Sequence, residues 1–314
     1  MPSWQASVLN LILSYVARPS ISRGKSKLPL GKVRDKMCYL DSRWLPWPER
    51  LLSQSFPLSQ SQLLHYHLVP DTNLSSSSLA NTHPLTGSLF YVRGGGFCFK
   101  TPHAHGRFLA HLAADCNVDV YVPDYRLAPE HPFPAPLEDV IEAYKALLSR
   151  KSAGDIIVMG DSAGGNLALC LLLELKRLSL PLPKACVLLS PALDFALTGD
   201  TELTLAADDP FFTIESLLRL RGAYLAGANP MSPQVSPLEG DLSNLPSMLV
   251  IAGTRELLLQ DSQRLLQQVS ALNGDIRGSF YHNMPHVFPL FEWLPEAVKA
   301  RREIAEFIRQ SLMG

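Results

Sequence analysis

The stretch Val158-Met159-Gly160-Asp161-Ser162-Ala163-Gly164-Gly165 decides how the rest of the chain is interpreted. The residues that lead into it, 155–159, are apolar and rich in β-branched side chains, which predicts a buried strand. The residues that follow, 166–178, are good helix formers and predict a helix. Gly-x-Ser-x-Gly between a strand and a helix is typical of a nucleophile elbow. We therefore expect Ser162 at a helix N-terminus, whose free N–H groups favour developing negative charge.

Short apolar stretches alternate with helical ones along most of the chain. Strands are expected at residues 63–69, 88–93, 118–123, 185–190, 248–252 and 276–281. Helices are expected at residues 103–116, 137–150, 213–225 and 294–312. This alternation predicts an α/β fold with a mostly parallel central sheet and helices on both faces.

Two regions depart from the alternation. Residues 1–60 contain one amphipathic apolar stretch, Val8 to Val16, and an otherwise irregular part, 18–60, rich in Ser, Pro and Arg. Residues 192–245 carry prolines and one short helix. We expect both regions to form a helical cap over the carboxyl ends of the strands, where ligands bind in open α/β sheets. The catalytic domain would then span 61–314, with a flexible serine-rich loop at 73–81.

Composition excludes several classes of protein. The formal net charge of −1 gives no reason to expect nucleic acid or an anionic membrane as a partner. The five cysteines are scattered and form no Cys/His cluster, so we expect no structural metal and no cofactor. Such cysteine usage favours a reducing, cytoplasmic location, with Cys170 and Cys186 as buried thiols. No segment reaches transmembrane length, although peripheral contact through residues 8–16 stays open, as does a homodimer.

A serine nucleophile needs a base and an acid that orients the base, and in folds with this elbow they follow in the order serine, acid, histidine. Two histidines follow Ser162, namely His282 and His286. His286 is favoured because it lies in a loop after the last strand, whereas His282 ends that strand. The acid is expected in the loop after residues 248–252.

That loop offers two carboxylates. Glu256 lies four residues past the strand, where it could reach the histidine. Asp261 comes five residues later and is interpreted as the N-cap of the next helix. Glu256 is therefore the predicted acid, with Asp261 as the alternative. The oxyanion of the reaction needs N–H donors, which Ala163 and the glycine run Gly94-Gly95-Gly96 could supply.

Five segments together resemble the hormone-sensitive-lipase-like carboxylesterases of the α/β-hydrolase fold. They are YVRGGGF at 91–97, DYRLAPEHPFPA at 124–135, GDSAGG at 160–165, SPALD at 190–194 and PHVF at 285–288. The resemblance covers about residues 60–312. It implies Ser162 as nucleophile, His286 as base and Glu256 at the acid position. It also implies oxyanion donors at Gly94, Gly95 and Ala163, and supporting polar roles for Asp161, Tyr125, Arg126 and Glu138.

Two residues depart from the family pattern. Arg93 stands where the glycine loop usually begins with histidine, and its guanidinium could replace the hydrogen bonds of the imidazole or attract a substrate carboxylate. Glu256 stands where the family more often has aspartate, which changes the reach of the carboxylate but not its role.

The resulting hypothesis is a serine hydrolase that cleaves a small to medium carboxylic ester through an acyl-enzyme. Phenylalanines in the loops suggest an apolar acyl or alcohol group: Phe97, Phe99, Phe211, Phe212 and Phe288. An alternative is a hydrolase diverted to cyclisation, elimination or lactonisation in a biosynthetic pathway, for which Arg93 and the N-terminal region are the hints. A small-molecule receptor on the same scaffold is less favoured, because receptors of this kind lack a triad member and all three positions here hold competent residues.

Overall fold

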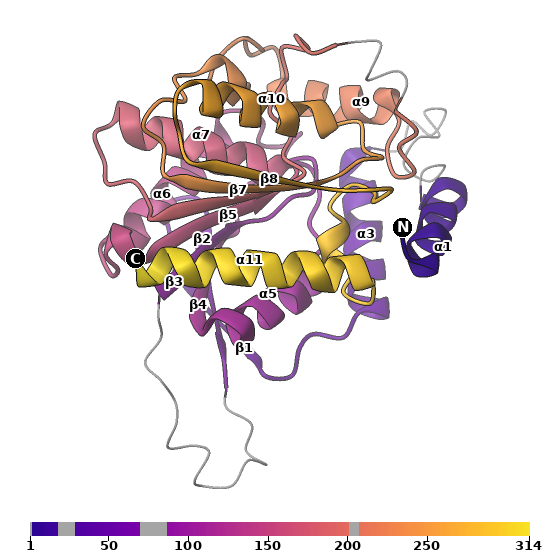
Figure 1. The fold of residues 1–314 in the computed structure, drawn as a ribbon, viewed down its shortest axis with the longest axis horizontal. Helices are drawn as coiled ribbons and strands as arrows, with labels where there is room; N and C mark the ends of the chain where they lie inside the picture. The colour runs from indigo at the N-terminus through magenta and orange to yellow at the C-terminus, as the bar shows by residue number, and fades with distance from the viewer. Residues whose placement is uncertain (1, 18–28, 70–86, 201–206) are drawn as a thin grey trace, which may run out of the picture.

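The computed structural model describes residues 2–17, 29–69, 87–200 and 207–314. Eight strands form one sheet in the order β1-β2-β4-β3-β5-β6-β7-β8 (Figure 1). Their bounds are β1 Leu51–Pro57, β2 Gln62–Leu68, β3 Gly87–Val92, β4 Val118–Pro123, β5 Ile156–Asp161, β6 Ala185–Leu189, β7 Ser247–Gly253 and β8 Ile276–Tyr281. The β1–β2 and β2–β4 pairs are antiparallel, and all other pairs are parallel. The predicted mostly parallel sheet is thereby confirmed.

Helices cover both faces of the sheet (Figure 1). One face carries α6 Ala135–Leu148, α7 Ala163–Arg177 and α10 Leu259–Ala271, and the other carries α5 Pro102–Cys116 and α11 Pro295–Met313. Side chains of the central strand β5 alternate between the two cores: Ile156 and Val158 face the first group of helices, Ile157 and Met159 the second. Because both faces are covered, this strand is apolar without a break, as parallel strands in α/β proteins are.

The N-terminal region is more regular than the sequence predicted. Helix α1, Trp4–Ile12, and the π-helical turn Leu13–Ala17 match the expected amphipathic stretch. The irregular structure expected for 18–60 is wrong where the structure describes it, because α3 occupies Leu30–Trp44 and β1 occupies Leu51–Pro57. Since β1 extends the sheet, the sheet begins ten residues earlier than the domain boundary predicted at 61.

Helix α3 packs through a narrow apolar face, Leu30, Val33 and Met37, and is anchored besides by charged side chains. Arg34 donates hydrogen bonds to the carbonyls of Cys98 at 2.6 Å and Ala128 at 2.7 Å. The buried Asp41 accepts from the N–H groups of His103 and Ala104 in the first turn of α5. Its carboxylate thus satisfies two N–H groups that a helix N-terminus leaves unpaired.

Other features expected from the sequence are a short helix, two buried thiols, a serine-rich loop and the lack of a membrane-spanning segment. The short helix expected at 213–225 is α9, Ile214–Leu225, capped by the side chain of Thr213. Cys170 and Cys186 are buried free thiols, as expected. The serine-rich loop at 73–81 lies outside the described residues. Within the described ranges, no helix combines the length and the apolar character needed to cross a membrane.

Candidate active site

The elbow forms where β5 ends at Asp161 and α7 begins at Ala163. Between them Ser162 has φ +53° and ψ −120°, a conformation that costs energy for a residue with a Cβ atom. The Ser162 N–H donates to the carbonyl of Leu189 on β6 at 2.8 Å, which ties the turn to the sheet. A Cβ atom on Gly164 would collide with the carbonyl oxygen of Val92, so only glycine allows α7 to start this close to β3.

The structure brings three predicted residues into one hydrogen-bonded chain. His286 Nε2 lies 2.9 Å from Ser162 Oγ, and His286 Nδ1 lies 2.7 Å from Glu256 Oε2. The three come from different loops, after β5, β7 and β8. All three side chains are at most 9% exposed, so their interactions are little weakened by water. In this geometry Nε2 can take a proton from the serine while the carboxylate holds the other nitrogen protonated.

Glu256 is itself held in place by two donors. Its Oε1 accepts from the N–H of Gly253 at 2.6 Å and from the hydroxyl of Ser190 at 3.0 Å. The same hydroxyl oxygen of Ser190 accepts from the N–H of Val287 at 3.1 Å, next to His286. Ser190 therefore links the acid to the loop of the base. Ser190 begins the motif SPALD at 190–194, and nothing in the sequence indicated that it would link these two loops.

Protonated His286 is favoured by its surroundings. Burial lowers the pKa of His286, but the hydrogen bond and charge of Glu256 and the charges of Asp209 and Asp161 raise the pKa by more, so the net shift is upward. These carboxylates would stabilise an imidazolium at His286 if it took a proton from Ser162.

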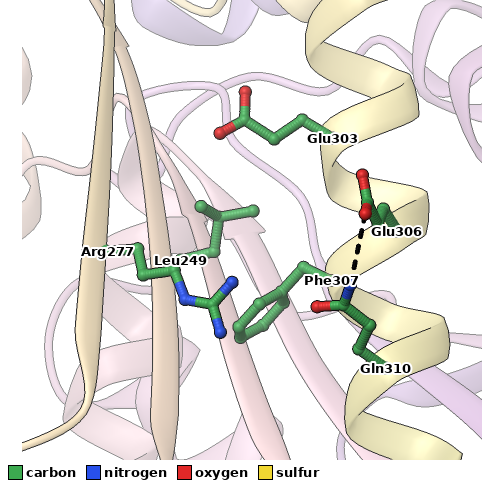
Figure 2. Close-up of a pocket in the computed structure, with 6 residues that line it drawn as sticks. All are labelled: Leu249, Arg277, Glu303, Glu306, Phe307 and Gln310. Atoms are coloured by element: carbon green, nitrogen blue, oxygen red, sulfur yellow. Dashed lines mark hydrogen bonds between the residues drawn. The ribbon is translucent and has the colours of Figure 1, made fainter.

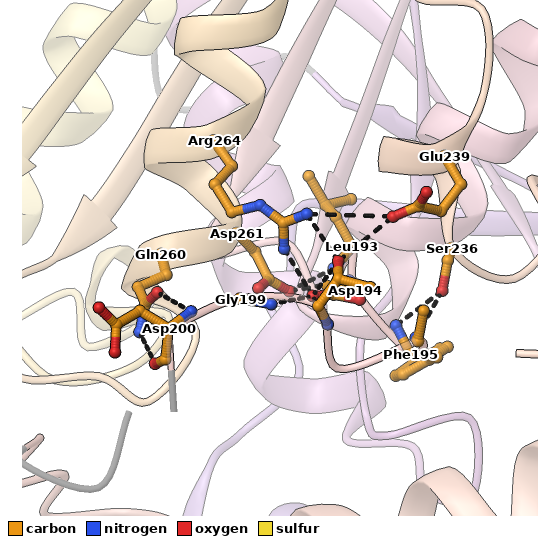
Figure 3. Close-up of polar contacts among 12 residues, drawn as sticks. Leu193, Asp194, Phe195, Gly199, Asp200, Ser236, Glu239, Gln260, Asp261 and Arg264 are labelled. Atoms are coloured by element: carbon orange, nitrogen blue, oxygen red, sulfur yellow. Dashed lines mark hydrogen bonds and ion pairs between the residues drawn. The ribbon is translucent and has the colours of Figure 1, made fainter. Parts of the chain in front are cut away.

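The two alternatives weighed from the sequence lie elsewhere. His282 is exposed. Asp261 lies in the first turn of α10 and is not its N-cap, because Leu258 holds that position. The carboxylate of Asp261 accepts from the N–H groups of Leu193 at 2.6 Å and Asp194 at 3.1 Å (Figure 3). Burial raises the pKa of Asp261 to about 7.

Asp261 belongs to a polar cluster that fastens the chain after β6 to α10 (Figure 3). Asp194 Oδ2 accepts from Arg264 at 2.5 Å and from the N–H groups of Thr198 and Gly199 at 2.7 and 2.9 Å. Ser236 accepts from the N–H groups of two residues that follow Asp194, 195 and 196. The cluster fixes the start of the 192–245 region and leaves Asp261 no contact with the histidine.

In the glycine loop, residues 94–96, Gly94 differs from the expectation that it is an oxyanion donor. The N–H of Gly94 donates to Asp161 Oδ1 at 2.7 Å, so it is already bonded and is not free for a substrate oxygen. The N–H groups of Gly95, Gly96 and Ala163 have no hydrogen-bond partner among the described residues. Gly95 has φ +112°, a conformation that side chains rarely allow. From the sequence, Gly94 and not Gly96 was expected as an oxyanion donor. A run of three glycines does not indicate which of their N–H groups forms a hydrogen bond within the protein.

Asp161 supports the glycine loop through a buried network of hydrogen bonds. Its carboxylate accepts from the hydroxyl of Tyr91 at 2.6 Å, and its oxygens lie 3.3 and 3.4 Å from His105 Nε2. His105 Nδ1 in turn lies 2.8 Å from the carbonyl of Thr101. Burial lowers the pKa of His105, but the charge and hydrogen bond of Asp161 raise it by more. The pKa of Asp161 is lowered in turn, against the effect of burial.

We expect the His105–Asp161 pair to make stability depend on pH. A histidine whose pKa is raised in the folded state contributes stability below its unfolded pKa of about 6.5 and loses it as pH rises through the folded pKa. The free energy of unfolding of the wild type should therefore fall more between pH 6 and pH 9 than that of His105→Gln. Urea unfolding at both pH values measures this, and equal losses in the two proteins would rule out the ion pair.

Arg93 is buried and forms three hydrogen bonds to protein groups. It is 4% exposed and donates to the carbonyls of Phe99 at 3.2 Å and Tyr125 at 3.1 Å and to Asp124 Oδ1 at 3.2 Å. Its guanidinium also lies 4.2 Å from the centre of the Tyr125 ring. Of the two roles considered from the sequence, these contacts match the replacement of the imidazole's hydrogen bonds.

The loop phenylalanines divide into two groups. Phe97 and Phe288 are buried, and Phe97 stacks on Tyr224 with ring centres 3.6 Å apart. Phe211 and Phe212 are partly exposed and lie beside the base, with Phe212 edge-on to His286 at 5.1 Å. Phe97 and Phe288 belong to the core clusters, so Phe211 and Phe212 are the members of the set that lie beside His286.

Two cavities of the structure lie away from Ser162, Glu256 and His286. A cavity of about 150 Å³ lies between α11 and strands β7 and β8 and contains none of the triad residues (Figure 2). Another of about 410 Å³ lies beside the β1–β2 hairpin and includes Asp124. Among the described residues, no group of three or more His, Cys, Asp or Glu side chains is arranged to hold a metal ion.

Comparison with known proteins gives the family. A family described as having the alpha/beta hydrolase fold matches residues 89–290. The chain is 37% identical to an esterase of Acinetobacter venetianus over 71% of this chain and 74% of that protein. It is 34% identical to an acetyl-hydrolase of Streptomyces hygroscopicus over 71% and 75%.

Solved structures agree with these relatives. The crystal structure of an esterase from the bacterial hormone-sensitive lipase family superposes with a TM-score of 0.86, at 29% identity and with 99% of each chain covered. The chain belongs to the hormone-sensitive-lipase-like esterases of the α/β-hydrolase fold and is a carboxylic ester hydrolase.

Proposed function

We propose that the protein hydrolyses carboxylic esters through a Ser162–His286–Glu256 triad and an acyl-enzyme. The observation that carries the proposal is the continuous hydrogen-bonded chain at 2.9 and 2.7 Å. Ser162 Oγ attacks the ester carbonyl carbon as its proton passes to His286 Nε2. The carbonyl oxygen becomes an oxyanion, for which the free N–H groups of Gly95, Gly96 and Ala163 are the proposed donors.

The intermediate then collapses in two stages. The alkoxide leaves and takes the proton from His286, so that an alcohol departs and the acyl group stays on Ser162. Water next attacks the acyl carbon while His286 accepts its proton, and the acid is released as that proton returns to Ser162 Oγ. Glu256 keeps His286 Nδ1 protonated throughout and stabilises the imidazolium.

We infer that the ester is small to medium in size. The partly exposed rings of Phe211 and Phe212 lie next to His286 and occupy space that a bulky substrate would need. The relative named an acetyl-hydrolase is consistent with a short acyl group.

The cap is also a proposal, made of residues before β1 together with 192–245. Three contacts support it. Leu220 of α9 lies so close to Gly96 that a Cβ atom there would meet its Cδ1 at 2.6 Å. Arg34 of α3 binds the carbonyl of Cys98, and Asn10 of α1 donates to the carbonyl of Asn283 at 2.9 Å. Each contact joins a cap element to the loop of the glycines or to the loop of His286.

Labelling and hydrolysis test the proposal together. We expect the purified protein to hydrolyse p-nitrophenyl acetate and butyrate, and a fluorophosphonate to stop turnover after one equivalent. Peptide mass spectrometry should then find the adduct on Ser162. An adduct on another residue, or turnover that survives full labelling, would contradict the proposal. The hydrogen bonds of Arg93 to protein groups support hydrolysis over the diverted-chemistry alternative, for which Arg93 was a hint.

A further inference from the structure

Asp209 is a buried carboxylate whose charge favours protonated His286 but whose hydrogen bonds have no part in the proposed triad. It is 1% exposed and lies in the segment before α9. Its Oδ1 accepts from the N–H groups of Phe211 at 2.7 Å and Phe212 at 2.9 Å. Its Oδ2 accepts from the N–H of Leu257 at 2.9 Å, and Leu257 directly follows the triad acid Glu256.

These contacts join the aromatic wall of the site to the loop of the acid. Phe211 and Phe212 pack against each other at 4.7 Å, and their ring centres lie 6.5 and 5.1 Å from the ring of His286. The side chain of Asp209 therefore holds both the Phe211–Phe212 pair and the residue that follows Glu256, and both lie near His286.

The way in which Asp209 is bound favours a positioning role. Its carboxylate accepts from three backbone N–H groups, and no Lys, Arg or His among the described residues forms an ion pair with it. A buried carboxylate without a cation is costly unless its oxygens are fully hydrogen-bonded. Asparagine could not satisfy all three donors, because its amide group would point N–H bonds at one of them.

We propose that Asp209 positions the Phe211–Phe212 wall against His286 and thereby sets the length of acyl chain that the enzyme accepts. The inference rests on the proposed ester hydrolysis and assigns its size selectivity to one residue. Asp209 does not touch the reacting atoms. It acts through Phe212, which lies closest to the base.

The neighbouring Asp208 provides a matched control. Its side chain is 76% exposed and pairs with Arg255, whose Nε also donates to the Asp208 carbonyl at 3.1 Å. Asp208→Asn makes the same charge change one residue away without touching the three N–H donors. It separates the loss of a negative charge near the site from the loss of the wall's support.

The experiment measures kcat/KM for p-nitrophenyl acetate and octanoate, with active enzyme counted by fluorophosphonate titration. In Asp209→Ala we expect the octanoate-to-acetate ratio to rise about tenfold, because a loosened wall admits the longer chain. Asp209→Asn should shift the ratio in the same direction by a smaller factor, and Asp208→Asn should stay within about twofold of the wild type. General destabilisation lowers activity toward both esters equally and leaves the ratio unchanged.

A double-mutant cycle tests whether Asp209 acts through Phe212. Phe212→Ala alone should raise the ratio, and adding Asp209→Ala should change it no further, because the two residues serve one wall. An unchanged ratio in both Asp209 variants, or additive effects in the double variant, would overturn the inference. Failure of the proposed function looks different, since the wild type itself would then hydrolyse neither ester or carry no label on Ser162.

Discussion

Alanine in place of Ser162 is expected to lower kcat for p-nitrophenyl butyrate by at least about 10⁴-fold, because the only nucleophile of the proposed mechanism is removed. The backbone there already carries a Cβ atom at φ +53°, so the change adds no strain and the protein should fold normally. Labelling by the fluorophosphonate should disappear with turnover. The measurement is kcat together with the labelled fraction, with far-UV circular dichroism as the check on folding.

Ser190→Ala is the matched control for this substitution. Ser190 also lies just past a strand, at φ +44°, and its hydroxyl is buried between Glu256 and the N–H of Val287. Its removal leaves the nucleophile intact and costs orientation only, so a fall of about tenfold is expected. If Ser162→Ala kept both labelling and turnover, the nucleophile would have to be another residue.

Glutamine in place of Glu256 is expected to lower kcat by roughly 10³- to 10⁴-fold, although it differs by one atom type. Oxygen Oε1 would keep its bonds to the Gly253 N–H and the Ser190 hydroxyl, which are both donors. The amide nitrogen would then face His286 Nδ1 and donate to it. This arrangement favours the tautomer with the proton on Nε2, which cannot accept the proton of Ser162.

Raising the pH should not restore the kcat of Glu256→Gln. The loss comes from the wrong tautomer of the neutral His286 imidazole, and a higher pH does not change which ring nitrogen carries the proton. A pH profile of kcat from 6 to 9 measures this. Asp261→Asn serves as the control, since Asp261 binds two backbone N–H groups away from the histidine. An equal loss of kcat in Asp261→Asn at equal folded fraction would contradict the assignment of Glu256 as the acid.

The sequence predicted the fold, and led to the proposed triad, because both inferences start from local patterns. The strand before Ser162 and the helix after it are strongly apolar, and the elbow glycines lie at fixed spacing. Once the elbow is recognised, the loops after the later strands leave few candidates, and the structure brings His286 and Glu256 into contact with each other. His286 and Ser162 are likewise within hydrogen-bonding distance.

Other features could not be predicted because they depend on distant partners. Helix α3 is anchored by Arg34 and Asp41, so its sequence lacks a broad apolar stripe. Strand β1 is an edge strand with mostly exposed side chains and pairs only with β2. The bond between Gly94 and Asp161 joins residues 67 positions apart and leaves no mark in a run of glycines.

With arginine at position 93, the hydrogen bonds that anchor the glycine loop do not depend on a side chain that changes its charge near neutral pH. Histidine changes its charge near neutral pH, whereas a guanidinium remains cationic at every pH that a folded protein tolerates. The bonds from Arg93 to Asp124 and to the carbonyls of Phe99 and Tyr125 therefore persist across that range. A histidine at this position would be a titratable anchor, whereas arginine is a permanently charged one.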